Sequence, residues 1–209
     1  MDKPLPPVAE NRPGTGRIET FVDGVVAILI TIMILELKIP AEVFSQGRLD
    51  RVLNVFGPQL AIYALSFVVI AIMLLNHHML MRAATRATNA LYWWNANLLF
   101  WMSLIPLSTA ALGDAPHEPL AVAFYGSVLA ATSISFTMLH RCAACLGDRD
   151  GRLDDIHRAI IKKDWFFTSL YTLSVPLAFV SIYASVAIFL IIPIAYFFPE
   201  FVPWPRSWR

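Results

Sequence analysis

A single carboxylate stands inside the first strongly apolar segment of the chain. Residues 17–40 read RIETFVDGVVAILITIMILELKIP, and Asp23 lies about a turn and a half inside this segment. A charged side chain inside a membrane helix costs roughly 2.5 to 3.5 kcal/mol on insertion scales, so such a residue usually serves a function. Asp23 is therefore the first candidate for a functional residue.

Two adjacent imidazoles, His77 and His78, lie near the end of the second apolar segment, just before Arg82. Consecutive membrane helices run in opposite directions, so Asp23 and the two histidines are expected about 8 Å from the same membrane boundary at 1.5 Å of rise per residue. A carboxylate facing an imidazole, with Arg17 one to two turns away, would form an internal polar cluster. Such a cluster can simply lock helices together, or it can also sense pH or gate a pathway through histidine protonation.

The composition places these residues in an integral membrane protein. Hydrophobic residues make up 57% of the 209 residues and charged residues 15%, which is unlike a soluble domain. Runs of about 20 apolar residues predict an all-α fold of six transmembrane helices. The expected spans are Ile18–Ile39, Asn54–Met81, Leu91–Leu112, Leu120–Leu146, Trp165–Val180 and Tyr183–Phe198, the last two separated by a tight turn near Ser181.

The distribution of lysine and arginine predicts the orientation of these spans. Most of the 16 Lys and Arg residues fall in the two terminal segments and in the second and fourth connections, which places both termini in the cytoplasm. We expect a polar, proline-rich N-terminal tail over residues 1–16, a six-helix transmembrane domain over residues 17–200 and a short C-terminal tail over residues 201–209. This is the organisation of a multi-pass membrane protein.

The first helix carries a stripe of residues that admits two interpretations. Gly24, Ile28, Thr31 and Leu35 share one face at 100° per residue, with Ile32 at its margin and Asp23 off it. On a lone helix such a stripe is typical of core packing, but it is also compatible with the lining of a pore.

Other chemistry has little support in the sequence. Cys142 and Cys145 form a C-x-x-C motif near His140 without a second pair of ligands, so neither a metal site nor a cofactor is expected. No nucleophile with its base and no phosphate-binding loop is apparent, which argues against an enzyme. A net charge near zero gives no indication of nucleic-acid binding.

Three ordered motifs within the first 115 residues resemble the endo-lysosomal transmembrane potassium channel family, in particular its bacterial six-helix members. The first is R-x-x-x-F-x-D-G-V, beginning at Arg17; the second is N-H-H at residues 76–78; and the third is the Y-W-W-N and S-L-I-P-L-S-T region of residues 92–109. The last three helices are similar to the family mainly in hydropathy and length.

The resemblance implies a homotetramer in the inner membrane of a prokaryote, in which the first helix of each subunit lines a central pore through the lipid bilayer for potassium ions. Ile28 corresponds to the hydrophobic constriction, and Thr31, Ile32 and Leu35 to the pore lining further outward. A network holding the pore helix corresponds to Arg17, Phe21, Asp23, His77 and His78. The family's F-S-D triplet departs here in its middle position, where Val22 replaces serine.

These expectations lead to a potassium-permeable cation channel with a hydrophobic constriction. An isoleucine ring would favour cations that lose water easily, and the absence of a T-V-G-Y-G filter predicts only modest preference for potassium over sodium. Two alternatives stay open: a proton-coupled secondary transporter that uses Asp23 and the histidines, and a membrane scaffold without a transport role. In a scaffold, the Ile28 stripe would merely be buried.

Overall fold

The computed structural model describes residues 15–37, 49–84, 86–146 and 151–197, and within these ranges the chain is helical with short turns. The side chains of residues 49–55, 83, 151–157, 159 and 197 are outside this description. The tails expected over residues 1–16 and 201–209 lie almost entirely outside the described residues. The helices are α1 (Thr15–Leu35), α3 (Leu49–Ala83), α4 (Asn89–Ser103), α5 (Ile105–Asp114), α6 (Pro119–Ala144), α7 (Gly151–Ala178) and α8 (Ile182–Phe197).

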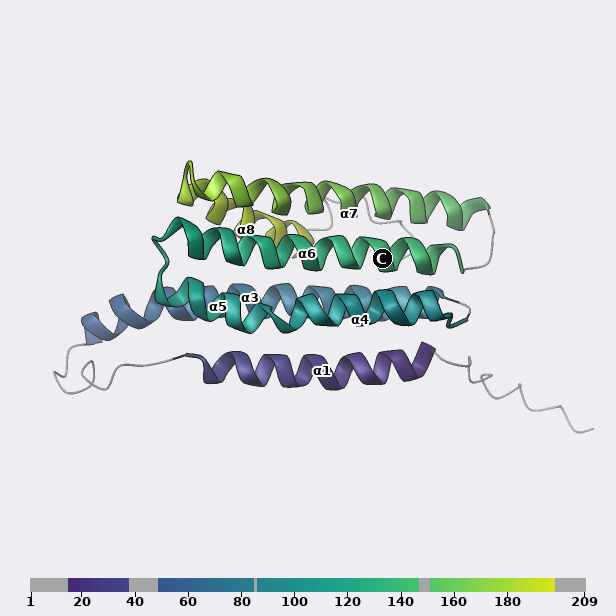
Figure 1. The fold of residues 1–209 in the computed structure, drawn as a ribbon, viewed down its shortest axis with the longest axis horizontal. Coiled ribbons are helices and arrows are strands. Elements are labelled where there is room, and N and C mark those ends of the chain that lie inside the picture. The colour runs from purple at the N-terminus through teal and green to yellow at the C-terminus, as the bar shows by residue number, and fades with distance from the viewer. Residues whose placement is uncertain (1–14, 38–48, 85, 147–150, 198–209) are drawn as a thin grey trace, which may run out of the picture.

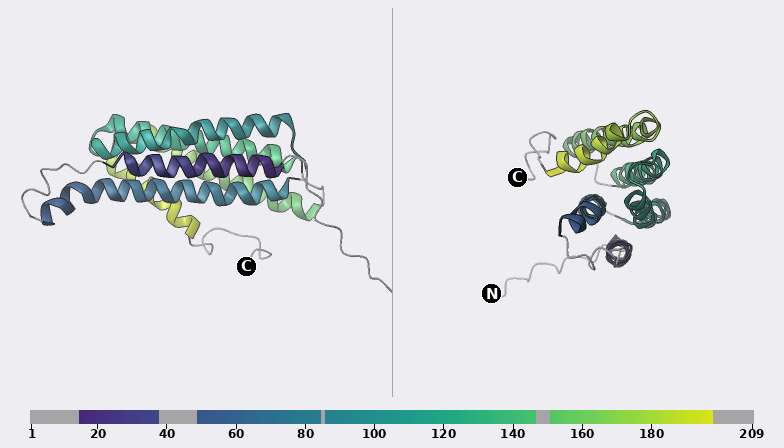
Figure 2. Two further views of the ribbon diagram at one scale, coloured as in Figure 1. Left: turned by 90° about the horizontal axis from the view of Figure 1, so that it is seen from below. Right: turned by 90° about the vertical axis from the view of Figure 1, so that its left-hand side faces the viewer.

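The helices lie roughly side by side in an elongated bundle (Figure 1). Helix α1 forms one margin, α3 and the α4–α5 pair form the next layer, and α7 lies at the opposite margin, beyond α6 (Figures 1 and 2). Helix α8 contacts α7, α6 and α3. The most extensive helix–helix contact joins α6 to α7, whereas α1 packs mainly on α3 and less on α5 and α4. The first helix is thus attached to the bundle along one side only.

Four helical segments are long and apolar enough to cross a membrane: Thr15–Leu35, Phe56–Arg82, Asn89–Asp114 and Pro119–Ala144. They correspond to the first four predicted spans. Helix α8 is apolar but shorter, and the apolar half of α7 follows a charged half. Both α3 and α7 begin well before the predicted spans because helical hydrogen bonding continues beyond the apolar residues.

The third segment is interrupted between α4 and α5 by Pro106. Proline has no amide hydrogen and its ring obstructs the carbonyl four residues earlier, so the regular ladder cannot continue. The amide of Leu104 instead donates to the carbonyl of Trp101 at 3.2 Å, and α5 starts at Ile105. The helix is therefore broken between Ser103 and Ile105, within a single predicted span.

The last two helices meet in the tight turn predicted near Ser181. Helix α7 ends at Ala178, and the amides of Val180 and Ser181 donate to the carbonyl of Leu177 at 3.0 and 2.7 Å. The amide of Ala184 then donates to the Ser181 hydroxyl at 3.4 Å, which helps to begin α8.

Helix α6 forms the centre of the subunit. Of its most apolar 18-residue window, 72% is buried, compared with 28% for α1. Close packing requires glycine at position 126, because an added Cβ would lie 2.8 Å from the Ser174 hydroxyl and 3.1 Å from Phe189. At Gly126, α6 therefore packs closely against α7 and α8 of the same chain.

The two ends of the bundle differ in charge. The end at which α1 begins, on the right in Figure 1, also holds the ends of α3 and α6 and the beginnings of α4 and α7. We call it the basic end, because the described cationic residues gather there: Arg17, Arg82, Arg86, Arg141, Arg158, Lys162 and Lys163. The described side chains of the opposite end include Glu36, Asp114 and Glu118 and no lysine or arginine.

Candidate pore-helix site

Helix α1 has one buried face and one exposed face. Ile18, Val22, Val26, Leu29 and Met33 recur at intervals of three and four and pack into the subunit core. The opposite face carries Gly24, Ile28, Thr31, Ile32 and Leu35, all exposed in the isolated subunit. The stripe singled out in the sequence is thus outside the core of its own subunit.

Ile28 illustrates this division most clearly. Its side chain is 58% exposed, whereas that of the adjacent Leu29 is 6% exposed. No heavy atom lies within 4 Å of the position that a Cβ would take at Gly24, one turn earlier on the same face. The face is therefore available to lipid, to another subunit or to a pore.

Asp23 is tied to the second helix through His78. The Asp23 carboxylate accepts a hydrogen bond from Nε2 of His78 at 2.7 Å, with the two side chains 50% and 31% exposed. An imidazole that donates through Nε2 can be neutral or protonated, so this contact is either a hydrogen bond or an ion pair. It fixes the polar residue of α1 against α3.

His77 points to a different neighbour. Its Nε2 donates to the Asn95 amide oxygen on α4 at 2.8 Å, and both residues are buried. Nδ1 of His77 is buried without a hydrogen-bond partner among the described residues. Of the two histidines that the resemblance places in the network, only His78 contacts Asp23, because adjacent helical residues diverge by 100°.

Arg17 and Phe21, the other residues that the resemblance places in the pore-helix network, do not take part in the contact between Asp23 and His78. Arg17 and Phe21 are exposed on α1, and no hydrogen bond or ion pair joins either to Asp23 or His78 in the described part of the chain. Val22, which stands where the family has serine, is 1% exposed and packs into the core. At this position an apolar contact replaces the hydroxyl of the family triplet.

Three consecutive residues of α3 face three different parts of the bundle. His78 contacts α1 and His77 contacts α4, whereas Asn76 lines a small cavity between α3, α6, α7 and α8. The volume of this cavity is about 20 Å³, enough for one water molecule. Its other polar lining residues include Ser133, Thr137 and Asp164.

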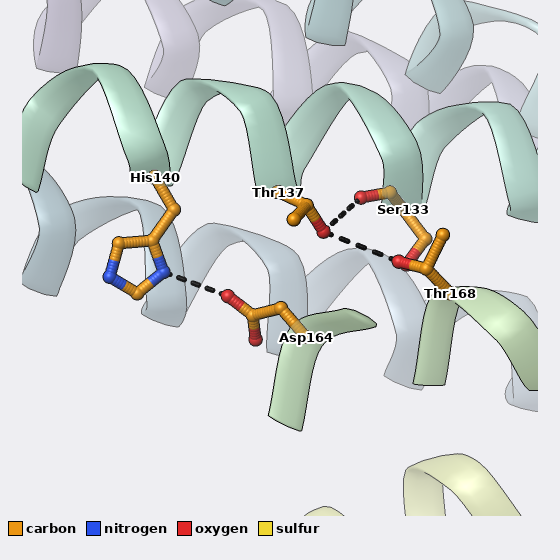
Figure 3. Close-up of polar contacts among 5 residues, drawn as sticks. All are labelled: Ser133, Thr137, His140, Asp164 and Thr168. Atoms are coloured by element: carbon orange, nitrogen blue, oxygen red, sulfur yellow. Dashed lines mark hydrogen bonds and ion pairs between the residues drawn. The ribbon is translucent and has the colours of Figure 1, made fainter. Parts of the chain in front are cut away.

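The same cavity borders a buried pair that the sequence did not reveal. His140 of α6 donates through Nδ1 to Oδ2 of Asp164 on α7 at 2.8 Å, and the two side chains are 7% and 6% exposed (Figure 3). One turn of α7 beyond Asp164, the Thr168 hydroxyl lies 3.2 Å from that of Thr137 (Figure 3) and is hydrogen bonded to that of Ser133 at 2.7 Å. The spacing of His140, Thr137 and Ser133 on one face of α6 was the available signal.

A second buried hydroxyl group lies toward the opposite end. Ser66 of α3 and Tyr125 of α6 are hydrogen bonded at 3.0 Å, and the Thr109 hydroxyl of α5 lies 2.8 Å from Ser66 and 2.7 Å from the carbonyl of Ile105. These bonds join three helices in an apolar interior, where an unpaired hydroxyl would be costly.

Metal-binding chemistry has no assembled site in the described residues. No group of three or more His, Cys, Asp or Glu residues is placed to hold an ion there. Cys142 and Cys145 are both free thiols.

Comparison with known proteins identifies similar chains. The sequence profile of "Endosomal/lysosomal potassium channel TMEM175" matches residues 17–106. A potassium channel of Chryseobacterium sp. (strain P1-3) is 32% identical over 88% of this chain and 93% of its own length. A potassium channel of Chamaesiphon minutus is 33% identical over 86% of this chain and 92% of its own.

The fold is also similar to a solved structure. The crystal structure of a lysosomal potassium-selective channel TMEM175 homolog from Chamaesiphon minutus matches with a TM-score of 0.76 and 33% identity, covering 87% of this chain and 95% of that one. An endosomal/lysosomal proton channel TMEM175 of Mus musculus is 30% identical over 60% of this chain, but over only 28% of its own length.

Proposed function

Because this chain belongs to the family of the endosomal/lysosomal potassium channel TMEM175, we propose that it conducts potassium ions through a pore lined by α1. The observation that supports the role of α1 is its exposed apolar face. Ile28, Ile32 and Leu35 make few contacts within the subunit, although the helix is apolar enough to lie in a membrane. A second copy of α1 across a central axis would cover this face.

We propose a homotetramer of six-helix subunits, with the basic end and both termini in the cytoplasm and the chain in the inner membrane of a prokaryote. The gathering of Lys and Arg at one end of the described bundle supports this orientation. Native mass spectrometry of detergent-solubilised protein tests the assembly, with a mass of four times 23.4 kDa expected. A monomer that is active in liposomes would contradict the tetramer.

Four copies of Ile28 around an axis would form a ring without oxygen ligands. Such a ring excludes a fully hydrated cation and can favour ions that lose their water shell at low cost. Potassium is dehydrated more easily than sodium, so the expected preference for potassium is modest. The Thr31 hydroxyl already donates to the carbonyl of Ile28 at 2.8 Å, which leaves its oxygen able to face a passing cation.

The contact between Asp23 and His78 would act on this ring indirectly. It joins α1 to α3 about a turn and a half before Ile28, at the basic end of the pore helix. A carboxylate that accepts a charge-assisted hydrogen bond holds its helix more firmly than an apolar contact would. We therefore give Asp23 and His78 a positioning role in the channel.

Ion flux through purified protein in liposomes tests the proposal. Potassium flux should exceed sodium flux in wild-type protein, and Ile28→Asn should reduce the preference because an amide can replace lost water. Leu173→Asn is the matched control, since Leu173 is 56% exposed on α7 at the far margin of the bundle (Figure 2).

The alternatives give different results in the same assay. A proton-coupled transporter would carry potassium only with a proton gradient and would respond to His78→Gln rather than to Ile28→Asn. A scaffold would show no flux above protein-free vesicles. Equal effects of Ile28→Asn and Leu173→Asn on ion preference would contradict a constriction at Ile28.

A further inference from the structure

Helix α4 carries a hollow on its exposed side, near the basic end, that takes no part in the proposed pore. Trp93, Trp94, Ala96 and Asn97 line it, and its volume is about 450 Å³. The Trp93 side chain is 77% exposed and that of Trp94 38%. Exposed indoles near the charged end of a membrane helix typically lie at the level of the lipid headgroups. The hollow therefore opens where headgroups are found.

Asn97 places a polar group inside the apolar span. Its Oδ1 accepts a hydrogen bond from the Ser135 hydroxyl of α6 at 2.6 Å, which holds the amide in place. The NH2 group of this amide donates to no acceptor among the described residues, although the side chain is exposed. Asn97 lies one turn deeper than Trp93, about 5 Å, which is near the boundary between headgroups and acyl chains. An NH2 group at this depth favours a ligand that brings an acceptor.

The charges beside the hollow have one sign. The beginning of α4 and the end of α6 lie together at the basic end (Figure 1). Arg86 lies three residues before α4, and Arg141 lies six residues beyond Ser135, about 9 Å further toward the same end. Both side chains are exposed, and no ion pair joins either to a carboxylate in the described part of the chain. Helices α4 and α6 contain no Asp or Glu, so a negatively charged ligand is complementary to this region.

An apolar stripe continues from the hollow toward the opposite end. Trp93, Phe100 and Leu107 recur at intervals of seven along α4 and α5, and all three side chains are exposed. Residues seven apart lie on nearly the same side of a helix, two turns apart. The region thus combines cationic groups, an amide donor and an apolar stripe, in that order from the basic end inward.

We propose that this hollow binds an anionic phospholipid from the leaflet at the basic end. The phosphate would lie near Arg86 and Arg141, an ester carbonyl would accept the hydrogen bond from Asn97, and an acyl chain would lie along Phe100. An apolar helix of a second subunit would leave the Asn97 NH2 group without an acceptor, whereas a phospholipid supplies one. A zwitterionic phospholipid has the same esters and chains but no net charge, so it should bind more weakly. The inference does not depend on ion conduction.

Quenching of tryptophan fluorescence by brominated lipids tests the proposal on full-length protein. Vesicles of phosphatidylcholine contain increasing fractions of brominated phosphatidylglycerol or of brominated phosphatidylcholine. The signal of the hollow is the difference between wild type and the double variant Trp93→Phe, Trp94→Phe. Half-maximal quenching should need an about fivefold or more lower fraction of the anionic lipid, since one arginine near a membrane surface contributes roughly this factor. The signal of Trp165 on α7, isolated by Trp165→Phe, should give a ratio near one.

Substitutions assign the preference to the residues around the hollow. The double variant Arg86→Gln, Arg141→Gln should bring the ratio between the two lipids close to one and leave quenching by brominated phosphatidylcholine unchanged. Asn97→Leu should weaken quenching by both lipids to the same extent, because the ester carbonyl is common to them. Lys162→Gln is the matched control, since Lys162 is an exposed cation of α7 at the same end and outside the hollow. It should keep the wild-type ratio.

Three results would overturn the proposal. A wild-type ratio of one means that the hollow has no preference for an anionic lipid. An equal loss of the ratio in Lys162→Gln and in the double arginine variant shows a general attraction to the basic end. A signal that neither lipid quenches shows that protein, such as a second copy of the chain, covers the hollow. Absence of potassium flux would overturn the proposed function but would leave these results unaffected.

Discussion

Helices α1 and α6 are both long and apolar, but α6 is mostly buried within the subunit and α1 is mostly exposed. In α6 most of the apolar window is buried within the subunit, and its polar side chains are paired inside the bundle. In α1 most of this window is exposed, and the pair of Asp23 and His78 lies at the surface. The difference indicates that α6 supports the fold of one subunit, whereas α1 is completed by something outside it.

The two helices should differ most in the unfolding free energy that is lost when a large apolar side chain is replaced by alanine. Leu129→Ala in α6 removes a side chain that is 1% exposed, which should cost about 2 to 5 kcal/mol of unfolding free energy through the cavity left behind. Ile28→Ala in α1 should leave the stability of the isolated subunit nearly unchanged. Unfolding in mixed micelles measures both, and equal losses would mean that the Ile28 face is covered within the subunit.

Glycine substitutions should give the next largest contrast. Gly126→Ala forces a Cβ against Ser174 and Phe189 and should destabilise the subunit by about 1 to 3 kcal/mol. Gly24→Ala meets open space and should be neutral or slightly stabilising in the subunit, because alanine favours a helix. Thermal unfolding in detergent compares the two variants. A destabilised Gly24→Ala subunit would show that this face is packed.

Removal of a carboxylate should cost more stability in the buried pair of His140 and Asp164 than in the surface pair of His78 and Asp23. Asp164→Ala leaves His140 buried without this partner and should cost about 1 to 3 kcal/mol. Asp23→Ala breaks a half-exposed contact, for which a loss of about 1 kcal/mol or less is expected. Double-mutant cycles with His140→Ala and His78→Ala isolate the pair energies. A larger energy for the surface pair would reverse this comparison.

Hydroxyl removal should produce the smallest effects. Ser66→Ala deprives Tyr125 and Thr109 of a buried partner and should cost about 1 kcal/mol. Thr31→Val removes an exposed hydroxyl that bonds only within α1, so its effect on unfolding should be close to zero. Flux measurements then tell whether the Thr31 hydroxyl serves permeation instead.

The sequence predicted the helices well where the thickness of the membrane sets the length of an apolar run. The first four spans follow from hydropathy. The turn near Ser181 follows from the length of the last apolar run, which is too long for one crossing and is divided into α7 and α8. The pairing of Asp23 with an imidazole also followed from depth alone. The choice between His77 and His78 did not, because it depends on the rotation of α3 about its axis, which Asn95 of α4 helps to fix.

The pair of His140 and Asp164 was missed for a related reason. The fifth span was expected to begin at Trp165, which leaves Asp164 in the polar connection before it. Helix α7 in fact starts at Gly151 and carries Asp164 along α6. Hydropathy reports where a helix becomes apolar, not where it begins, and therefore cannot show that a charged residue just before a span is buried.

Asn76, His77 and His78 face three different parts of the bundle, and this arrangement restricts how α3 can move. Turning this helix about its own axis would take all three side chains from their neighbours at once, whereas sliding or tilting could preserve part of each contact. Rotation of α3 would therefore break the bond of His77 with Asn95 together with the bond of His78 with Asp23. The position of α1 is in this way tied to the rotational setting of α3, and through it to α4.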